Sequence, residues 1–332
     1  MQEFHHILRA DSVAELISLE RSFLSGNSGW NPVFRRYLLS SADQESLFDD
    51  TIGAVSFIVQ PPLDGSAVAV WLYLVKDAGV EYGSGRTVVR DRDCEYFWYS
   101  SCVSADDGPE EQTRRILEVY EASLADDGMN VRDNCVRTWF FVHDIDRNYS
   151  GLVKARRENF ETEGLTPRTH YIASTGICGD PCAPGSVVQM DALAMRGRFT
   201  QTYLYAPTHL NPTYEYGVTF ERGVRVDSDG LSRTYISGTA SINNRGEVVH
   251  VGDVAAQTGR MLENIDVLLD EAGACWDDIR MALVYLRNAG DYDVVAPLIA
   301  GRLPGVPYVI LLAPVCRPDW LVEMECIASR RK

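Results

Sequence analysis

Hydrophobic and polar positions follow the same order twice along this chain. Gln112–Gly128 and Gln257–Gly273 both begin with Gln-Thr, carry apolar residues at helical spacing and end at a glycine. Apolar positions three and four residues apart predict amphipathic helices, and a glycine directly after them is typical of a helix C-terminus. A constant offset in residue number relates the two stretches, so we interpret them as copies of one element.

The chain continues from each of these helices through the same series of elements. Apolar runs at Cys135–Val142 and Met281–Leu286 are typical of buried strands, and second helices are expected at Ser150–Phe160 and Val294–Leu303. Two further strands close each copy, at Thr169–Ser174 and Val187–Ala194 in the first and at Val309–Pro314 and Leu321–Ala328 in the second. A hairpin around Asp229–Gly230, with strands Thr213–Val226 and Arg233–Ile242, opens the second copy.

These elements predict an α+β fold built from a tandem pair of β–β–α–β–α–β–β units, each with a mixed sheet and its helices packed on one face. We place the boundary between residues 197 and 198, because the last strand of the first copy ends near Met195–Phe199. Residues 1–197 then form an N-terminal unit and residues 198–332 a C-terminal unit. Before the repeat, the pattern predicts a helix at Val13–Leu24 and strands at Ile52–Val59, Val68–Val75 and Glu95–Ser101.

The overall charge narrows the classes of partner. The chain of 332 residues has 31 Lys and Arg against 47 Asp and Glu, a net charge of −16, which argues against nucleic acid and anionic membranes. There is no signal peptide pattern and no apolar run long enough to span a membrane, so we expect a cytoplasmic protein. The eight cysteines lack zinc spacing and no loop has a phosphate-binding form, so we expect neither a metal nor a cofactor.

Two acids interrupt the apolar strand at the end of the chain. Aligning VVQMDALA of the first copy with LVEMECIA of the second places Gln189 opposite Glu323 and Asp191 opposite Glu325. A carboxyl in an apolar strand is either paired or kept protonated with a raised pKa. Since only the position of Glu325 keeps an acid in both copies, we interpret Glu325 as structural and Glu323 as the candidate general acid. A β-bulge could exchange which of the two reaches a cleft.

The C-terminal unit resembles the RidA/YjgF family from about Tyr214 to Arg330, through TYEYGVTFERG, YISGTASIN, GDVAAQTGRMLENIDVLLDEAG and LVEMECIA. RidA-like proteins have a chorismate-mutase-like fold, form trimers with ligand sites between subunits, and in many cases deaminate enamines and imines. The resemblance implies a site acid at Glu323, an entry tyrosine at Tyr216 and a backbone contact at Ser237–Gly238. The family's P-A-R is replaced by Val306-Pro307-Tyr308-Val309; the missing Arg counts against ordinary imine deamination.

The fused pair, with STGICG and APVCRPDWLVEME, resembles the chorismatases over nearly the whole chain. Those enzymes convert chorismate to pyruvate and either a cyclohexadienediol carboxylate or a hydroxybenzoate, and members in xanthomonad pigment and ubiquinone pathways form both 3- and 4-hydroxybenzoate. The resemblance implies chorismate as substrate, with Glu323 as the acid and Cys316 against the ring, where members that form 3-hydroxybenzoate are similar. We therefore predict formation of pyruvate and 3- and/or 4-hydroxybenzoate. The alternatives are hydrolysis to a dihydroxycyclohexadiene carboxylate, RidA-type deamination, or a binding module without chemistry.

Chorismate is a dianion whose enolpyruvyl ether is inert until its vinyl methylene is protonated. The reaction needs a neutral carboxylic acid in a pocket that excludes water, and Arg residues to bind two carboxylates. The candidate Arg residues are Arg317, Arg287, Arg147, Arg156 and Arg157, and the candidate contacts from other residues are Tyr171, Tyr216, Gly238, Thr239 and Ala240. Two fused units cannot by themselves complete a three-fold arrangement, so we expect a monomer with an open cleft or a homo-oligomer, a trimer included.

Overall fold

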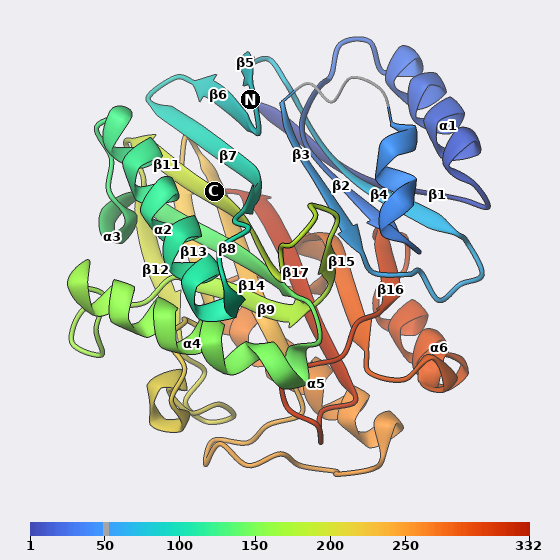
Figure 1. Cartoon of the computed structure of the whole chain (residues 1–332), viewed down its shortest axis with the longest axis vertical. Coiled ribbons are helices and arrows are strands. Elements are labelled where there is room, and N and C mark those ends of the chain that lie inside the picture. The colour runs from blue at the N-terminus through green and yellow to red at the C-terminus, as the bar shows by residue number, and fades with distance from the viewer. Residues whose placement is uncertain (49–52) are drawn as a thin grey trace.

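Three mixed β-sheets form the framework of the protein (Figure 1). The computed structural model describes residues 1–48 and 53–332. Within these residues the sheets have the strand orders β1-β4-β2-β3-β10, β5-β6-β7-β11-β8-β9 and β12-β13-β14-β17-β15-β16.

The elements have the following bounds within the described residues. The first sheet contains β1 (Gln2–Ala10), β2 (Asn31–Leu39), β3 (Ala54–Val59), β4 (Val68–Lys76) and β10 (Asp180–Pro181). The second contains β5 (Gly79–Gly83), β6 (Arg86–Asp91), β7 (Cys94–Val103), β8 (Cys135–Val142), β9 (Ala173–Cys178) and β11 (Val188–Gly197). The third contains β12 (Thr200–Leu204), β13 (Gly223–Ser228), β14 (Leu231–Ala240), β15 (Ile279–Leu286), β16 (Tyr308–Leu312) and β17 (Val322–Arg331). The α-helices are α1 (Val13–Gly26), α2 (Gly108–Asp126), α3 (Val131–Asn134), α4 (Ile145–Thr162), α5 (Val254–Glu271) and α6 (Tyr292–Arg302).

The second and third sheets repeat one topology. In each, three successive antiparallel strands are followed by the last strand of the unit and then by a parallel pair, β8 with β9 or β15 with β16. Helix α2 follows β7 and helix α5 follows β14, each of which is the third strand of its sheet. Helix α4 connects β8 to β9, and helix α6 connects β15 to β16. This equivalence confirms the repeat and the α+β fold that the hydrophobic pattern predicts.

The two-unit pattern does not account for the first sheet. Its order β1-β4-β2-β3 matches β7-β11-β8-β9 in the second sheet, and β2 and β3 are parallel like β8 and β9. Residues 1–197 therefore contain two sheets, one of them a shortened version that lacks the first two strands of the repeat. A short 3₁₀ turn at Ala42–Leu47 replaces the second helix, so this region lacks the second helical pattern by which the other two copies can be recognised.

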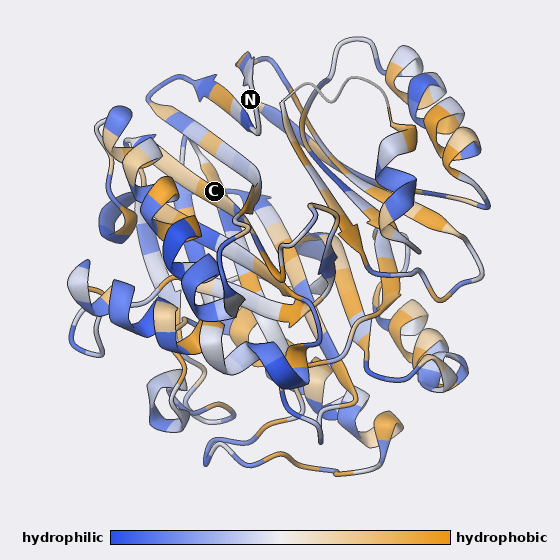
Figure 2. Cartoon of the chain, in the orientation of Figure 1, coloured by the Kyte–Doolittle hydropathy of each residue, from blue (hydrophilic) through white to orange (hydrophobic). Residues whose placement is uncertain are grey.

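The inner faces of the three sheets meet in one hydrophobic core. Trp98 of β7 and Trp139 of β8 stack on each other, and Trp71 of β4 meets both rings edge-on. Ile236 and Met281 of the third sheet belong to the same cluster. Helix α1 packs on the first sheet, α2 on the second and α5 on the third, while α4 lies against α2. Helices α2 and α4 are largely hydrophilic on the side turned to the viewer (Figure 2), whereas α6 also exposes Val294 and Leu298. The boundaries between the three sheets thus lie within one chain.

Two predicted strands begin later than the pattern suggests. In place of a strand from Thr213, residues Thr213–Tyr216 form a 3₁₀ turn that ends at Gly217 with a φ of 86°, and β13 starts at Gly223. Pro212 and Gly217 favour this turn over an extended chain. Strand β9 likewise starts at Ala173, after a turn at residues 166–169. The predicted strand at Ile52–Val59 is observed as β3, whereas Ile52 lies outside the described residues.

Candidate active site

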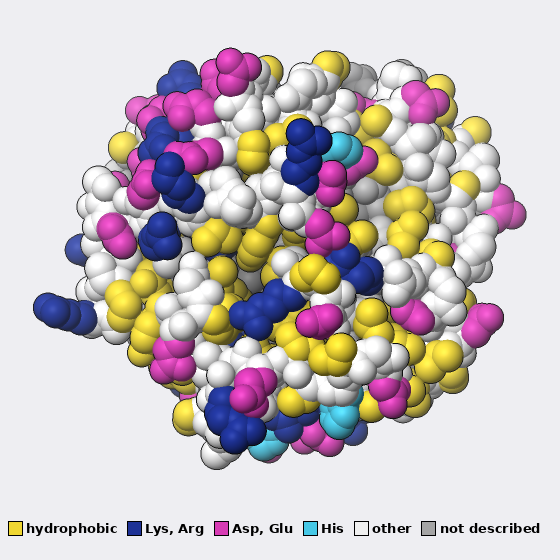
Figure 3. Space-filling model, turned by 60° about the horizontal axis from the view of Figure 1, so that its bottom comes forward, with side chains coloured by type: hydrophobic (Ala, Val, Ile, Leu, Met, Phe, Trp, Pro, Cys, Tyr) yellow, Lys and Arg dark blue, Asp and Glu magenta, His cyan; other side chains and the backbone are white. Residues whose placement is uncertain are grey.

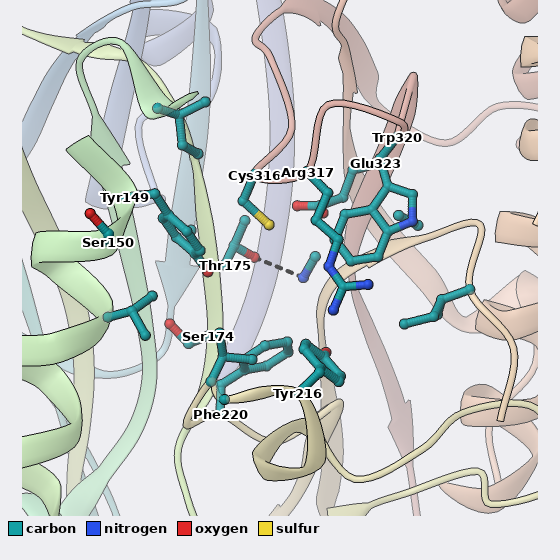
Figure 4. A pocket seen from close by; sticks show the side chains of 18 of the residues that line it. Tyr149, Ser150, Ser174, Thr175, Tyr216, Phe220, Cys316, Arg317, Trp320 and Glu323 are labelled. Atoms are coloured by element: carbon teal, nitrogen blue, oxygen red, sulfur yellow. Dashed lines mark hydrogen bonds between the residues drawn. The ribbon is translucent and has the colours of Figure 1, made fainter. Parts of the chain in front are cut away.

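We call each of the three sheets with its helices a unit, numbered as the sheets are, so the first and second copies of the sequence repeat are the second and third units. A cavity of about 420 Å³ lies between the second and third units. Helix α4 and strand β9 form one wall, and β14 and β17 form the opposite wall. The loop between β16 and β17 and the turn before β13 close two further sides (Figure 4). In Figure 3, hydrophobic side chains and several Lys or Arg side chains surround a hollow in the face shown. Apolar and aromatic side chains outnumber polar and charged ones in the wall, through Ile145, Tyr149, Val153, Tyr216, Val218, Phe220, Ala240, Ile242, Cys316 and Trp320.

Glu323 lies on β17 in the wall of this cavity. Its neighbours across the sheet are Ala240 on β14 and Tyr285 on β15, and its carboxyl points into the cavity (Figure 4). Burial is the main cause that raises its pKa to about 8; the Glu325 charge adds to the rise, while Arg137 and Arg222 oppose it. A carboxyl with this pKa is mostly protonated at pH 7. Glu323 is therefore a buried acid that can donate a proton to a ligand.

Gly238 makes the room for this carboxyl. A Cβ atom at position 238 would lie 2.2 Å from Oε1 of Glu323. The register between β14 and β17 shifts between Ile236 and Thr239, so β14 carries a bulge at Gly238. The bulge leaves Glu323 directed into the cavity, as Figure 4 shows.

Glu325 is instead occupied by hydrogen bonds within the protein. Its Oε2 accepts from Arg137, from Trp139 Nε1 at 2.9 Å and from Thr175 Oγ1 at 2.5 Å, and its Oε1 accepts from Tyr285 at 2.7 Å. Three of these donors come from the second unit, so the carboxylate joins the two units. The structure thus directs the two neighbouring acids to different tasks: one faces the cavity and the other is bound on both oxygens.

Three guanidinium groups line the cavity. Arg156 on α4 is 1% exposed, and its Nε and Nη2 have no hydrogen-bond partner among the described residues. Arg222, just before β13, is 4% exposed and donates to the backbone oxygen of Asn211 at 2.9 Å. Arg317 lies over the ring of Tyr216 at 4.5 Å and donates to the backbone oxygen of Gly246. Together they make the cavity attractive to an anion in a chain of strongly negative net charge.

The sequence analysis did not predict Arg222 as a site residue. It predicted Arg156 together with Arg147 and Arg157, of which only Arg156 lines the cavity. Arg147 and Arg157 are exposed and do not line the cavity, because the helical repeat turns neighbouring side chains of α4 to different faces. The signal that could have identified Arg156 is its position on the apolar face of the helix, with Leu152 and Phe160.

Other predicted residues divide between the cavity and its supports. Arg287 binds both carboxylate oxygens of Asp146, at 2.9 and 3.1 Å, and donates to backbone oxygens of the loop between β16 and β17, so it holds the loop from outside the cavity. Tyr171 lines a neighbouring cavity, and Thr239 donates to the backbone oxygen of Ser237. The structure brings together in the cavity wall Glu323, Cys316, Arg317, Tyr216, Gly238 and Ala240.

Burial keeps the thiol and the phenol groups of the cavity neutral at pH 7. It raises the pKa of the Cys316 thiol to about 12, with a further contribution from Glu323, so this thiol is a poor nucleophile. Burial also raises the pKa of Tyr149 and of Tyr216. The hydroxyl of Tyr216 has no hydrogen-bond partner among the described residues. Within the described residues, no three His, Cys, Asp or Glu side chains are grouped as metal ligands. No helix there is long and apolar enough to cross a membrane.

Comparison with solved structures identifies this arrangement of sheets. A crystal structure described as a chorismatase superimposes with a TM-score of 0.72, covering 98% of both chains at 20% sequence identity. The chain has the fold of a chorismatase. Its residues 225–330 match the family model described as Endoribonuclease L-PSP; this range covers most of the third sheet, from within β13 to β17, with helices α5 and α6, and leaves out β12. The resemblance of the sequence to chorismatases and RidA-like proteins is thereby confirmed at the level of the fold.

Two curated proteins are similar in sequence. The 3-hydroxybenzoate synthase of Streptomyces hygroscopicus is 28% identical over 284 residues, which span 77% of this chain and 79% of that protein. The 3-aminoacrylate deaminase RutC of Acinetobacter baylyi is 34% identical over 97 residues, or 28% of this chain and 76% of that protein. The likeness to the synthase therefore extends over most of the chorismatase fold, and the likeness to the deaminase over little more than a quarter of the chain.

Proposed function

We propose that this protein is an enzyme that cleaves the enolpyruvyl ether of chorismate to pyruvate and a hydroxybenzoate. The observation that carries the proposal is the buried acid Glu323, whose pKa of about 8 keeps it protonated at pH 7 where it faces the cavity. Protonating a vinyl carbon requires such an acid. The chorismatase fold and the likeness to a 3-hydroxybenzoate synthase support the choice of substrate.

The charges of the cavity suit a dianion. Arg156 reaches it from the second unit and Arg222 and Arg317 from the third. An anion beside Arg156 would satisfy buried N–H groups that have no partner among the described residues. We assign the three Arg residues to the two carboxylates of chorismate, the Tyr216 hydroxyl to a hydrogen bond with substrate, and Gly238, Ala240 and Cys316 to contacts with the ring.

In the reaction, Glu323 transfers its proton to the vinyl methylene carbon and leaves an oxocarbenium ion. Capture of this cation by water would give pyruvate and the dihydroxycyclohexadiene carboxylate. In the route to a hydroxybenzoate, the bond between the ring and the ether oxygen breaks and this oxygen leaves as the keto oxygen of pyruvate. The ring keeps its own hydroxyl and becomes aromatic by losing a C–H proton, which returns to the Glu323 carboxylate. Chorismate has the same atoms as pyruvate plus hydroxybenzoate, so this outcome consumes no water. The apolar walls at Phe220, Ala240 and Ile242 limit water in the cavity and favour the hydroxybenzoate over the hydrolysis product.

Incubation of the purified protein with chorismate tests the proposal. Pyruvate is followed by coupled reduction with lactate dehydrogenase, and 3-hydroxybenzoate, 4-hydroxybenzoate and the dihydroxycyclohexadiene carboxylate are separated by chromatography. We expect pyruvate and hydroxybenzoate in equal amounts, well above the rate without protein. A diene product would assign hydrolysis, and ammonia release from an amino-acid-derived imine would assign deamination. Chorismate binding without any pyruvate would identify a binding module and contradict the proposal.

A further inference from the structure

Two carboxyl groups of β17 lie on the same face of the strand. Glu323 and Glu325 are two residues apart, which places their Cα atoms roughly 7 Å apart in a strand. Like charges at such a distance in a protein interior disfavour each other, so the two groups do not ionise independently. Which of them holds the proton depends on the donors that surround each one.

The donors are distributed very unequally. Four groups donate to Glu325, namely Arg137, Trp139, Thr175 and Tyr285. No hydrogen-bond donor among the described residues contributes to the ionisation of Glu323. Arg137 is fixed in its direction, because its Nη2 also donates to Thr175 Oγ1 and its guanidinium lies over the Trp139 ring at 4.8 Å. The buried cation that lowers the pKa of Glu323 most is therefore bound to Glu325.

We propose that Glu325 is a positioning residue: by binding Arg137 and three neutral donors, it keeps the negative charge of the pair on itself and the proton on Glu323. The kinetic test of this inference rests on the proposed function, because it needs chorismate turnover. The spectroscopic test does not depend on that function. Thr175 links the pair to the cavity wall, since its Oγ1 also accepts from the backbone N–H of Gly238 at 2.9 Å (Figure 4).

Five other titratable or charged groups surround Glu323, and they leave Glu325 and Arg137 as the main charges that set its protonation. They are Arg137 of β8, Tyr149 of α4, Arg222 before β13, Tyr285 of β15 and Cys316 of the loop before β17. Burial raises the pKa of Tyr149, Tyr285 and Cys316, so these three are neutral at pH 7. The charges that act on Glu323 are then Glu325, Arg137 and Arg222, of which Arg222 is directed to Asn211.

The first copy shows that such an ion pair also has a joining role. There, Arg36 donates to Asp191 at 3.1 and 2.8 Å, both side chains are fully buried, and Gln189 stands in place of Glu323. The pair thus persists between two units where the acid is missing. A test must therefore separate the joining of units from the retention of the proton.

The kinetic test is the dependence of kcat/KM on pH in Glu325→Gln, which removes the charge and keeps the shape. A general acid works in its protonated form, so kcat/KM of the wild type should fall as pH rises through about 8. In Glu325→Gln we expect this fall to begin at least about one pH unit lower, which lowers the activity at pH 8 by roughly fivefold or more, with little change near pH 5. Glu325→Asp, which keeps the charge, should follow the wild type. Equal losses at every pH would indicate joining alone and overturn the proposal.

The spectroscopic test needs no turnover. The infrared carbonyl band of protonated Glu323 is the band that disappears in Glu323→Gln, and its loss with rising pH reports ionisation directly. We expect loss at lower pH in Glu325→Gln, and a smaller shift in the same direction in Tyr285→Phe, which serves if the first variant does not fold. An unchanged midpoint in both variants overturns the proposal even if chorismate is cleaved. A shifted band without chorismate cleavage supports it and rejects the proposed function.

Discussion

The carboxyl of Glu323 occupies the space that a side chain at Gly238 would fill, since a Cβ there would lie 2.2 Å from Oε1. The substitution Gly238→Ala should therefore displace the acid and lower kcat by about 100-fold or more, because a misplaced acid loses most of its contribution. The measurement is steady-state pyruvate release. Gly259→Ala is the matched control: its Cβ meets nothing within 4 Å on helix α5, and its activity should not change. Normal activity in Gly238→Ala would place the reacting atoms away from Glu323.

Glu323→Gln should lower kcat by roughly 100-fold to 10,000-fold, the range that general acid catalysis contributes. The amide keeps the shape of the acid and cannot supply its proton, and the first copy carries Gln189 at the equivalent place. Chorismate binding, measured by calorimetry, should remain. The exposed Glu118→Gln on helix α2 serves as control. Wild-type turnover in Glu323→Gln would transfer the role of the acid to another group.

The same variant should change how stability depends on pH. The pKa of Glu323 rises from 4.5 to about 8 on folding, so its contribution is most favourable below pH 4.5 and is lost as pH rises towards 8, by about 1.4 kcal/mol per pH unit. Glu323→Gln lacks this loss. Relative to the wild type, it should gain about 3 kcal/mol in free energy of unfolding between pH 5 and pH 8. Urea denaturation at both pH values measures this, and a constant difference would contradict the raised pKa.

Arg156 and Arg157 offer a matched pair on one helix turn. Arg156 is buried in the cavity wall and Arg157 is exposed. We expect Arg156→Met to lower kcat/KM for chorismate by about 30-fold or more, mainly through KM, because a charged hydrogen bond to a carboxylate contributes about 2 kcal/mol. Arg157→Met should stay close to the wild type. Equal effects of the two substitutions would indicate a general response of α4 and remove Arg156 from the binding site.

The boundary between the first and second units shows why one acid site is described and not two. Gln189 Nε2 donates to Ser56 at 3.1 Å and to Ser101 at 3.4 Å. The register of β7 with β11 places Ser101 where β14 has Gly238, and Ser101 has a φ of 51°. A side chain thus fills in this copy the space that the glycine leaves open in the other. The second unit therefore has neither the acid, which is replaced by Gln189, nor the glycine, which is replaced by Ser101.

The sequence by itself determined the repeat and the α+β fold, and it predicted Glu323 as the acid. The helices at Gln112–Gly128 and Gln257–Gly273 can be recognised from the sequence alone, because each has an apolar face that recurs at helical spacing. The distinction between Glu323 and Glu325 also came from the sequence, through Gln189 and Asp191 at the equivalent positions. The first sheet was not recognised as a further copy, because the pairing of its strands depends on residues far apart, as between β1 and β4.

Only the tertiary structure decided the surroundings of the acid. Arg137 and Thr175 meet Glu325 across the boundary between units, at separations of more than a hundred residues, and no local pattern predicts such contacts. The same holds for Arg222, whose role depends on where the turn before β13 crosses the cavity. Protonation of Glu323 follows from burial and from the direction of neighbouring charges, which are properties of packing in three dimensions and are absent from the order of residues along the chain.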